Sequence, residues 1–259
     1  MKHGSLRVFC LILMACITAA SGFGDEFTIS LETIVLETFD NGSAAQYDWN
    51  VQGSKFTTKT DAVTYPKSAF VAAWPSQLFR SKDGEDADGN TLNALGIQGA
   101  FDRRGDNWID IYPTYKEDNA DTGAEAGAPA EITATGRTDE ISMWVWSMNL
   151  DYYLEVYARD YLGIVHVIKL GDLRYNGWKK LTAKVPSTIP QTKKTYPRLE
   201  SLKIVKFRLW TKPREQVSPF YVYFDQLAIL TDTFESIYDG DDLADPAVVQ
   251  ELWNEEGGQ

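Results

Sequence analysis

His166 is the first residue to consider for chemistry, because an imidazole can act as a general base or bind a metal ion near neutral pH. It stands in the run Ile164-Val165-His166-Val167-Ile168, which is typical of a β-strand. A lone histidine in such a run is more typical of a packed or paired side chain than of a catalytic base. The sequence has no Gly-x-Ser-x-Gly motif, no glycine-rich phosphate loop and no pair of histidines spaced to share a metal ion. We therefore predict that His166 is not catalytic.

Acidic residues could do two kinds of chemistry. A pair of carboxylates can hydrolyse a glycosidic bond, but the chain has 37 Asp and Glu residues and no spacing singles out two of them. Carboxylates also bind calcium. Oxygen-rich side chains gather in one polar loop and again at 239–242; the loop contains Asp83, Glu85, Asp86, Asp88 and Asn90. Neither segment has the spacing of an EF-hand loop. We predict solvated loops and assign no catalytic, cofactor-binding or metal-ligating residue, leaving a structural calcium ion open without naming its ligands.

The eight tryptophans could form a platform on which sugar rings stack. We predict instead that Trp144, Trp146 and Trp178 pack in the core. The positions of Trp74, Trp210 and Trp253, beside proline or in the C-terminal tail, favour a sheet edge or an interface.

Charge is segregated along the chain. Residues 179–214 carry eleven Lys and Arg residues and one acid, Glu200, whereas residues 82–140 carry fourteen acids and five bases. Residues 231–259 contain nine acids and no Lys or Arg. These charges could pair within one molecule or stay solvated. In a repeating assembly, the basic face of one subunit would instead meet an acidic face of the next. The formal net charge of −12 makes general binding to nucleic-acid phosphates unfavourable.

The N-terminus has the pattern of an export signal. Lys2 and Arg7 precede an apolar run, Val8–Ala15, and Ala20 offers a cleavage site. The apolar run is too short to span a bilayer. We therefore predict a cleaved signal peptide at residues 1–20 and an exported mature chain without a membrane span.

Both cysteines, Cys10 and Cys16, lie within this signal peptide. The mature chain would contain no thiol, which excludes thiol catalysis and zinc bound by cysteine. Leu13-Met14-Ala15-Cys16 is similar to a lipoprotein cleavage box, so lipid anchoring at Cys16 is the alternative to a soluble product.

Four consecutive strands within residues 141–186 form the centre of the predicted fold. Ile141–Met148 is apolar on both faces, as in a doubly buried strand. Tyr152–Arg159 alternates, so that its apolar face carries Tyr152, Leu154, Val156 and Ala158. Asp160–Gly163 is predicted as a hairpin connection to Ile164–Leu170, and Trp178–Val185 follows. Four antiparallel strands in tandem require a second sheet over their apolar face.

Many short strands separated by turn residues favour an all-β fold. Six further strands are predicted at Leu31–Phe39, Trp49–Thr60, Leu95–Phe101, Trp108–Tyr112, Leu202–Trp210 and Tyr221–Leu230. The predicted class is an antiparallel β-sandwich of the jelly-roll, galactose-binding-like kind over residues 21–230.

Residues 231–259 are predicted to be an acidic tail with one short helix. Asp245 can cap this helix and Pro246 can occupy its first position. Val249 and Trp253 can share one side. Because two turns of helix are marginal alone, the helix must dock on something.

Two stretches carry a resemblance to a known family. They are DYYLEVYARDYLGIVHVIKLGDLRYNGWKKLTAKVP at 151–186 and YVYFDQLAILTDTFESIYDGDDLADP at 221–246. Together with the signal peptide, the early LETIVLETFD and the acidic tail, they resemble the outer-layer (class A) flagellar filament proteins of spirochaetes. The resemblance implies a non-enzymatic periplasmic subunit that sheathes a flagellin core and contributes to filament stiffness, shape and motility. Its implied partners are core flagellins and other sheath subunits, including copies of itself. The alternative from another class is a secreted carbohydrate-binding jelly-roll module.

Overall fold

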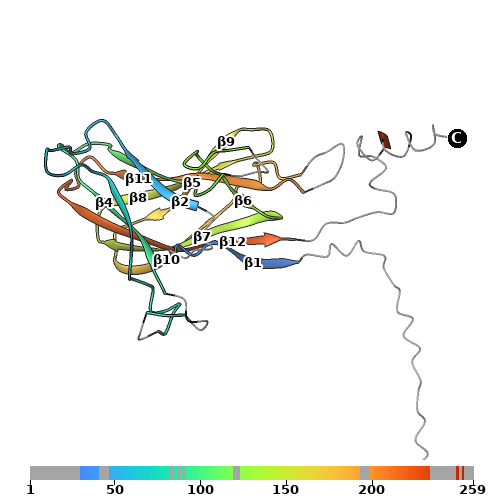
Figure 1. Ribbon diagram of the computed structural model, residues 1–259, viewed down its shortest axis with the longest axis horizontal. Helices are drawn as coiled ribbons and strands as arrows, with labels where there is room; N and C mark the ends of the chain where they lie inside the picture. The colour runs from blue at the N-terminus through green and yellow to red at the C-terminus, as the bar shows by residue number, and fades with distance from the viewer. Residues whose placement is uncertain are drawn as a thin grey trace, which may run out of the picture.

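Twelve strands build the part of the chain that the structure describes (Figure 1). The computed structural model describes residues 30–40, 47–81, 84–86, 89, 91–118, 123–192, 199–233, 249–250 and 253. The strands are β1 (Leu31–Glu37), β2 (Tyr47–Gly53), β3 (Lys67–Val71), β4 (Ala94–Gly99), β5 (Trp108–Tyr115), β6 (Ile132–Ala134), β7 (Arg137–Met148), β8 (Tyr152–Arg159), β9 (Val165–Asp172), β10 (Asn176–Lys184), β11 (Leu202–Thr211) and β12 (Phe220–Asp232).

The strands form two antiparallel sheets that lie face to face (Figure 1). Sheet A has the order β10-β7-β12-β4-β3, and β1 also pairs with β12. Sheet B has the order β2-β5-β11-β8-β9, and β6 also pairs with β11. The predicted all-β antiparallel sandwich is therefore confirmed.

The prediction that the four consecutive strands form one layer, covered by a second sheet, is wrong. β7 and β10 belong to sheet A, whereas β8 and β9 belong to sheet B. The chain leaves β7 through Asn149, whose φ of 65° is left-handed and whose N–H donates to the Tyr175 carbonyl at 2.8 Å. After this crossing, the apolar faces of β7 and β8 bury each other. Hydrophobic alternation specifies which face of a strand is buried, but not which sheet the strand joins.

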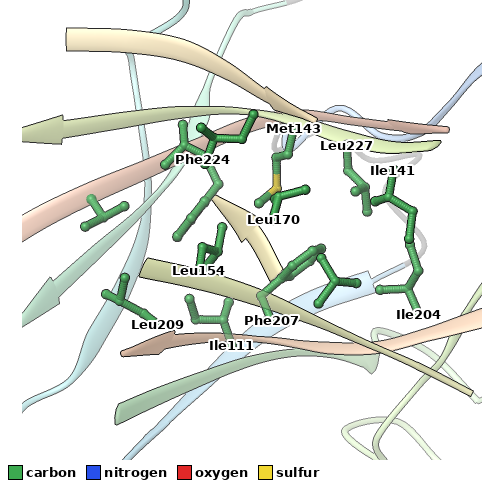
Figure 2. Close-up of a cluster of buried hydrophobic side chains, with 14 of the residues drawn as sticks. Ile111, Ile141, Met143, Leu154, Leu170, Ile204, Phe207, Leu209, Phe224 and Leu227 are labelled. Carbon is green, nitrogen blue, oxygen red and sulfur yellow. The ribbon is translucent and has the colours of Figure 1, made fainter. Parts of the chain in front are cut away.

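The core lies between the sheets. The predicted apolar face of β8 is confirmed, because Tyr152, Leu154, Val156 and Ala158 are fully buried. Figure 2 shows Met143 and Phe224 from sheet A pointing toward Leu154 and Phe207 from sheet B. Burial of each such side chain contributes about 1.5–3 kcal/mol relative to exposure.

Two strands were missed from the sequence because they are short. β3 lies between Tyr65-Pro66 and Trp74-Pro75, and it is the edge strand of sheet A. β6 lies within residues 117–136, which lack an apolar period, and it pairs Ala134 with Leu202 at the start of β11. Three to five residues are too few to show a reliable alternation.

Parts of the predicted ends lie outside the described residues. The signal peptide, both cysteines and the start of the tail helix are among them. Val249, Gln250 and Trp253 have helical backbone, and Trp253 is 79% exposed. Within the described residues, no helix has the length and apolar character needed to cross a bilayer.

Candidate functional site

The outer face of sheet B carries a connected set of charged and aromatic side chains. β11 points Phe207 and Leu209 into the core, so Lys206, Arg208 and Trp210 point outward. The strand register sets outward residues in rows across the sheet. One row contains Trp108, Trp210 and Tyr153, and the next contains Asp110, Arg208 and Glu155.

A buried carboxylate holds two cations in this face. Asp110 Oδ1 accepts a hydrogen bond from Arg208 Nε at 2.5 Å, and Asp110 Oδ2 accepts from Arg208 Nη2 at 2.7 Å. Lys206 Nζ also donates to Asp110 Oδ2, at 2.8 Å. The hydrogen bonds to Asp110 raise the pKa of Arg208, although partial burial opposes this. The network is a structural ion cluster rather than a reactive pair, because Arg208 remains protonated.

Cations lie over the aromatic rings of the same face. The Arg208 guanidinium is 4.4 Å from the Trp108 ring centroid and 5.2 Å from that of Tyr157. Lys206 Nζ is 4.9 Å from the Tyr157 centroid, and Trp210 Nε1 donates to Glu155 at 2.7 Å. Because cations already lie over these rings, the covered ring faces are not free to stack on sugars.

An exposed apolar strip adjoins this face at the edge of sheet B. Leu162 is 61% exposed, Ile164 54%, Val165 39% and Val167 52%. Val167 pairs with Tyr157 and therefore continues the outward row that contains Lys206. The sequence signal for this strip was present, since Val165 and Val167 share one face of β9, but that pattern alone could also indicate a doubly buried strand.

We name two sets of residues together as the contact face: the outward side chains of sheet B and the strip beside them. They are Trp108, Asp110, Tyr153, Glu155, Tyr157, Leu162, Ile164, Val165, Val167, Lys206, Arg208 and Trp210.

The tryptophan predictions are partly wrong. Trp144, Trp146 and Trp178 are not in the core but half-buried on the outer face of sheet A. Trp146 packs edge-on against Tyr223, with ring centroids 5.2 Å apart. The core tryptophan is Trp49, which is 5% exposed.

The other three tryptophans have different positions. Trp210 lies on β11, a central strand of sheet B, and therefore not at an edge. Trp74 lies in the loop between β3 and β4, where its ring is next to Gly84. Trp253 is exposed on the tail.

The basic segment 179–214 does not form one strip. Lys179, Lys180 and Lys184 lie on β10 in sheet A, whereas Lys206 and Arg208 lie on β11 in sheet B.

Several of the charges in this segment pair within the molecule, as the first of the two interpretations held. Besides the Asp110 network, Lys212 Nζ donates to Asp151 at 2.6 Å, a carboxylate that also pairs with Arg174 from outside the segment. The remaining bases of the segment at 193–198 and the acidic tail at 234–248 lie outside the described residues.

His166 is a paired side chain, as predicted. Its Nε2 lies 2.7 Å from Oδ2 of Asp160, whose side chain is fully buried. Asp160 Oδ1 also accepts the N–H groups of Leu162 and Ile164, each at 2.9 Å. Burial acts to raise the pKa of Asp160, but these three hydrogen bonds together lower it. The pair holds the predicted β8–β9 hairpin, and no nucleophile is hydrogen-bonded to His166 among the described residues.

Of the predicted oxygen-rich residues, Glu85 and Asp86 are described, and Asp83, Asp88, Asn90 and 239–242 lie outside the described residues. No group of three or more His, Cys, Asp or Glu side chains is gathered closely enough to hold a metal ion among the described residues.

Sequence reasoning missed Asp225 on β12, which is 1% exposed. Burial, with a contribution from the charge of Asp40, raises the pKa of Asp225 to about 8. The available signal was a single Asp inside the apolar run Tyr221–Leu230.

A protein-family model described as flagellar filament outer layer protein FlaA matches residues 64–237. A flagellar filament outer layer-like protein of Brachyspira hyodysenteriae is 25% identical over 153 residues, which is 59% of this chain and 64% of that protein. The match thus spans less than two thirds of the relative's length.

Among solved structures, a family 11 carbohydrate-binding module from a cellulosomal cellulase of Clostridium thermocellum is similar at a TM-score of 0.40 and 8% identity, covering 82% of this chain and 99% of that one. TmCBM61, solved with β-1,4-galactotriose, has a TM-score of 0.35 and 13% identity, with 71% of this chain and 88% of that one covered.

Proposed function

This chain belongs to the flagellar filament outer layer protein family, and on that premise we propose that it is a structural subunit of the sheath around a periplasmic flagellum. In this role it coats the flagellin core and contributes to the stiffness and shape of the filament, and hence to cell motility. It acts without catalysis. Its partners are core flagellins and other sheath subunits, including further copies of this chain.

The observation that carries the proposal is the contact face of sheet B. It combines Tyr, Trp and Arg side chains, which are enriched at protein interfaces, with an apolar edge strand. An edge strand with exposed Val165 and Val167 is a liability in a free monomer, because it can pair with other chains. In a filament, a neighbouring subunit would cover it.

We further propose how the chain is divided and where it acts. Residues 1–20 direct export and are removed, residues 21–230 form the sandwich, and residues 231–259 form the acidic tail. The mature protein would then reside in the periplasm, as part of the flagellum.

The first experiment asks whether the protein co-purifies with periplasmic filaments and is released from them by mild acid or salt. Recovery in the soluble fraction, with none on the filaments, would contradict the proposed function.

The second experiment tests the contact face with Val167→Lys. Covering the exposed half of Val167 removes roughly 80 Å² of apolar surface from water, worth about 2 kcal/mol at ~25 cal/mol/Å². Loss of this contribution corresponds to a roughly 30-fold weaker association. Stability of the free subunit should change by less than about 0.5 kcal/mol, since Val167 faces solvent.

Thr182→Lys is the matched control, because Thr182 is also β-branched and exposed on an edge strand, but on β10 of sheet A. Binding to filaments stripped of their sheath should fall for Val167→Lys and stay unchanged for Thr182→Lys. Equal binding by the two variants would remove the contact face from the proposal without affecting the sheath role itself.

A further inference from the structure

A line of aromatic side chains crosses the outer face of sheet A, on the side away from sheet B (Figure 1). Trp178 of β10 pairs with Trp146 of β7, and Trp146 pairs with Tyr223 of β12. The preceding residues Val145 and Val222 are fully buried in the core, so the rings that follow them point outward. Because neighbouring strands lie ~4.8 Å apart, the line extends roughly 10 Å across the three strands. We name Trp146, Trp178 and Tyr223 the aromatic row.

The aromatic row continues onto positions with very small side chains. Tyr223 pairs with Gly96 of β4, and Gly96 pairs with Ala69 of β3. A Cβ on Gly96 would lie 3.0 Å from Cε1 of Tyr223, so the Tyr223 ring extends over this glycine. No large side chain in this line therefore blocks a molecule that lies along the rings.

The rings of the aromatic row are not covered by charge, unlike those of the contact face. Within the part of the chain that the structure describes, no cation lies over any of the three rings. The indole Nε1 atoms of Trp146 and Trp178 are open to solvent and donate to no residue whose position is described. On the contact face, by contrast, Trp210 Nε1 donates to Glu155. Apart from the edge-on contact between Trp146 and Tyr223, the aromatic row thus offers ring surface and N–H donors to a ligand.

Neutral hydrogen-bonding groups border the aromatic row. In the neighbouring line of sheet A, Gln98 Nε2 donates to the Tyr221 hydroxyl at 3.0 Å, and Asn176 lies exposed on β10. Carboxamide and hydroxyl groups both donate and accept hydrogen bonds, which suits a ligand with many hydroxyl groups. Two exposed lysines, Lys67 and Lys180, flank the row without lying over its rings.

We propose that the aromatic row binds a neutral, β-linked glycan chain. Successive sugar rings would stack on Trp178, Trp146 and Tyr223, and their hydroxyl groups would hydrogen-bond to Gln98 and Asn176. A pyranose ring has a C–H face that packs on an aromatic ring, whereas its hydroxyl groups point sideways and need donors and acceptors there. A β-1,4-linked chain is extended, so its sugars meet rings that stand in one line. A globular protein partner would instead require a compact apolar centre.

Isothermal titration calorimetry of the purified full chain with cellohexaose and chitohexaose tests the site. The two probes distinguish a plain glucan from an N-acetylated glycan. We expect a Kd of about 10⁻⁴–10⁻³ M for at least one of them, together with a change in tryptophan fluorescence. Because the ligand is neutral, the Kd should change less than about twofold when NaCl is raised to about 1 M. Maltohexaose, a coiled α-linked chain, should bind at least about tenfold more weakly.

Trp178→Ala should weaken binding at least about tenfold, because one stacking ring is lost. Trp253→Ala is the matched control, because Trp253 is 79% exposed but lies outside the aromatic row, and this variant should bind like the wild type. If Trp178→Ala does not fold, Gln98→Ala should weaken binding about threefold to tenfold through the loss of one hydrogen bond.

The proposal is overturned if neither β-linked hexasaccharide binds at about 5 mM, or if Trp178→Ala and Gln98→Ala both bind as tightly as the wild type. It is also overturned if maltohexaose binds equally well, or if salt abolishes binding, since the lysines beside the row would then be responsible. None of these outcomes bears on the sheath role, because the aromatic row lies on sheet A and the contact face on sheet B.

Discussion

Replacing Asp110 with Asn should destabilise the sandwich, because its buried carboxylate holds two cations. The Asp110 side chain is 8% exposed and accepts three charge-assisted hydrogen bonds, two from Arg208 and one from Lys206. Asn removes the negative charge and leaves two cations over the aromatic rings of the contact face. Those cations then lack the group that holds them.

The expected magnitude follows from burial. Removing one partner of a fully buried pair costs about 3–5 kcal/mol. The side chains of Arg208 and Lys206 are 18% and 24% exposed, so water can recover part of this cost. We therefore expect about 2–4 kcal/mol for Asp110→Asn, which corresponds to a decrease in Tm of about 5–15 °C for a domain of this size.

Asp151→Asn is the matched control. Asp151 also has two cationic partners, Arg174 and Lys212, but their side chains are 67% and 41% exposed. Hydrogen bonds and charge from these partners lower the pKa of Asp151, yet the pair is solvated and should contribute little to stability. Thermal unfolding followed by circular dichroism measures both variants. Equal Tm values for Asp110→Asn and Asp151→Asn would refute the argument from burial.

Three further predictions concern the hairpin, the core and the tail. Asp160→Ala should destabilise the sandwich by about 1–3 kcal/mol through lost hydrogen bonds. Because the folded pKa of Asp160 lies below its ordinary value of 3.8, this contribution to stability is present above about pH 4 and is lost as the pH falls further. The Tm values of wild type and variant should therefore converge when they are measured at decreasing pH. Gly99→Ala should cost about 1–3 kcal/mol in urea unfolding, because a Cβ would lie 2.4 Å from the buried Phe220 ring. Deleting residues 239–259 should leave the Tm of the sandwich unchanged but reduce its recovery on filaments; normal recovery would exclude a role for the tail.

Strand periodicity predicted most of the strands, but it did not predict which outward faces stay exposed, for a physical reason. The alternation of Tyr152–Arg159 identified a buried face correctly, because one side of β8 is fully buried and the other is partly exposed. β7 is apolar on both faces, and β9 carries Val165 and Val167 on its outward face, which predicts burial on both sides of each strand. In the structure, Trp146 and Val167 point outward, where the Tyr223 ring partly covers Trp146 and Val167 stays exposed. A sequence pattern does not distinguish a doubly buried strand from a strand with an exposed apolar face.

The burial of Asp225 was beyond sequence reasoning for a different reason. Asp225 is visible as an acid inside an apolar run, but an acid at that position could pair with any of the bases of the chain. Its burial depends on where β4, β1 and β7 meet β12, and only the assembled sheet shows this.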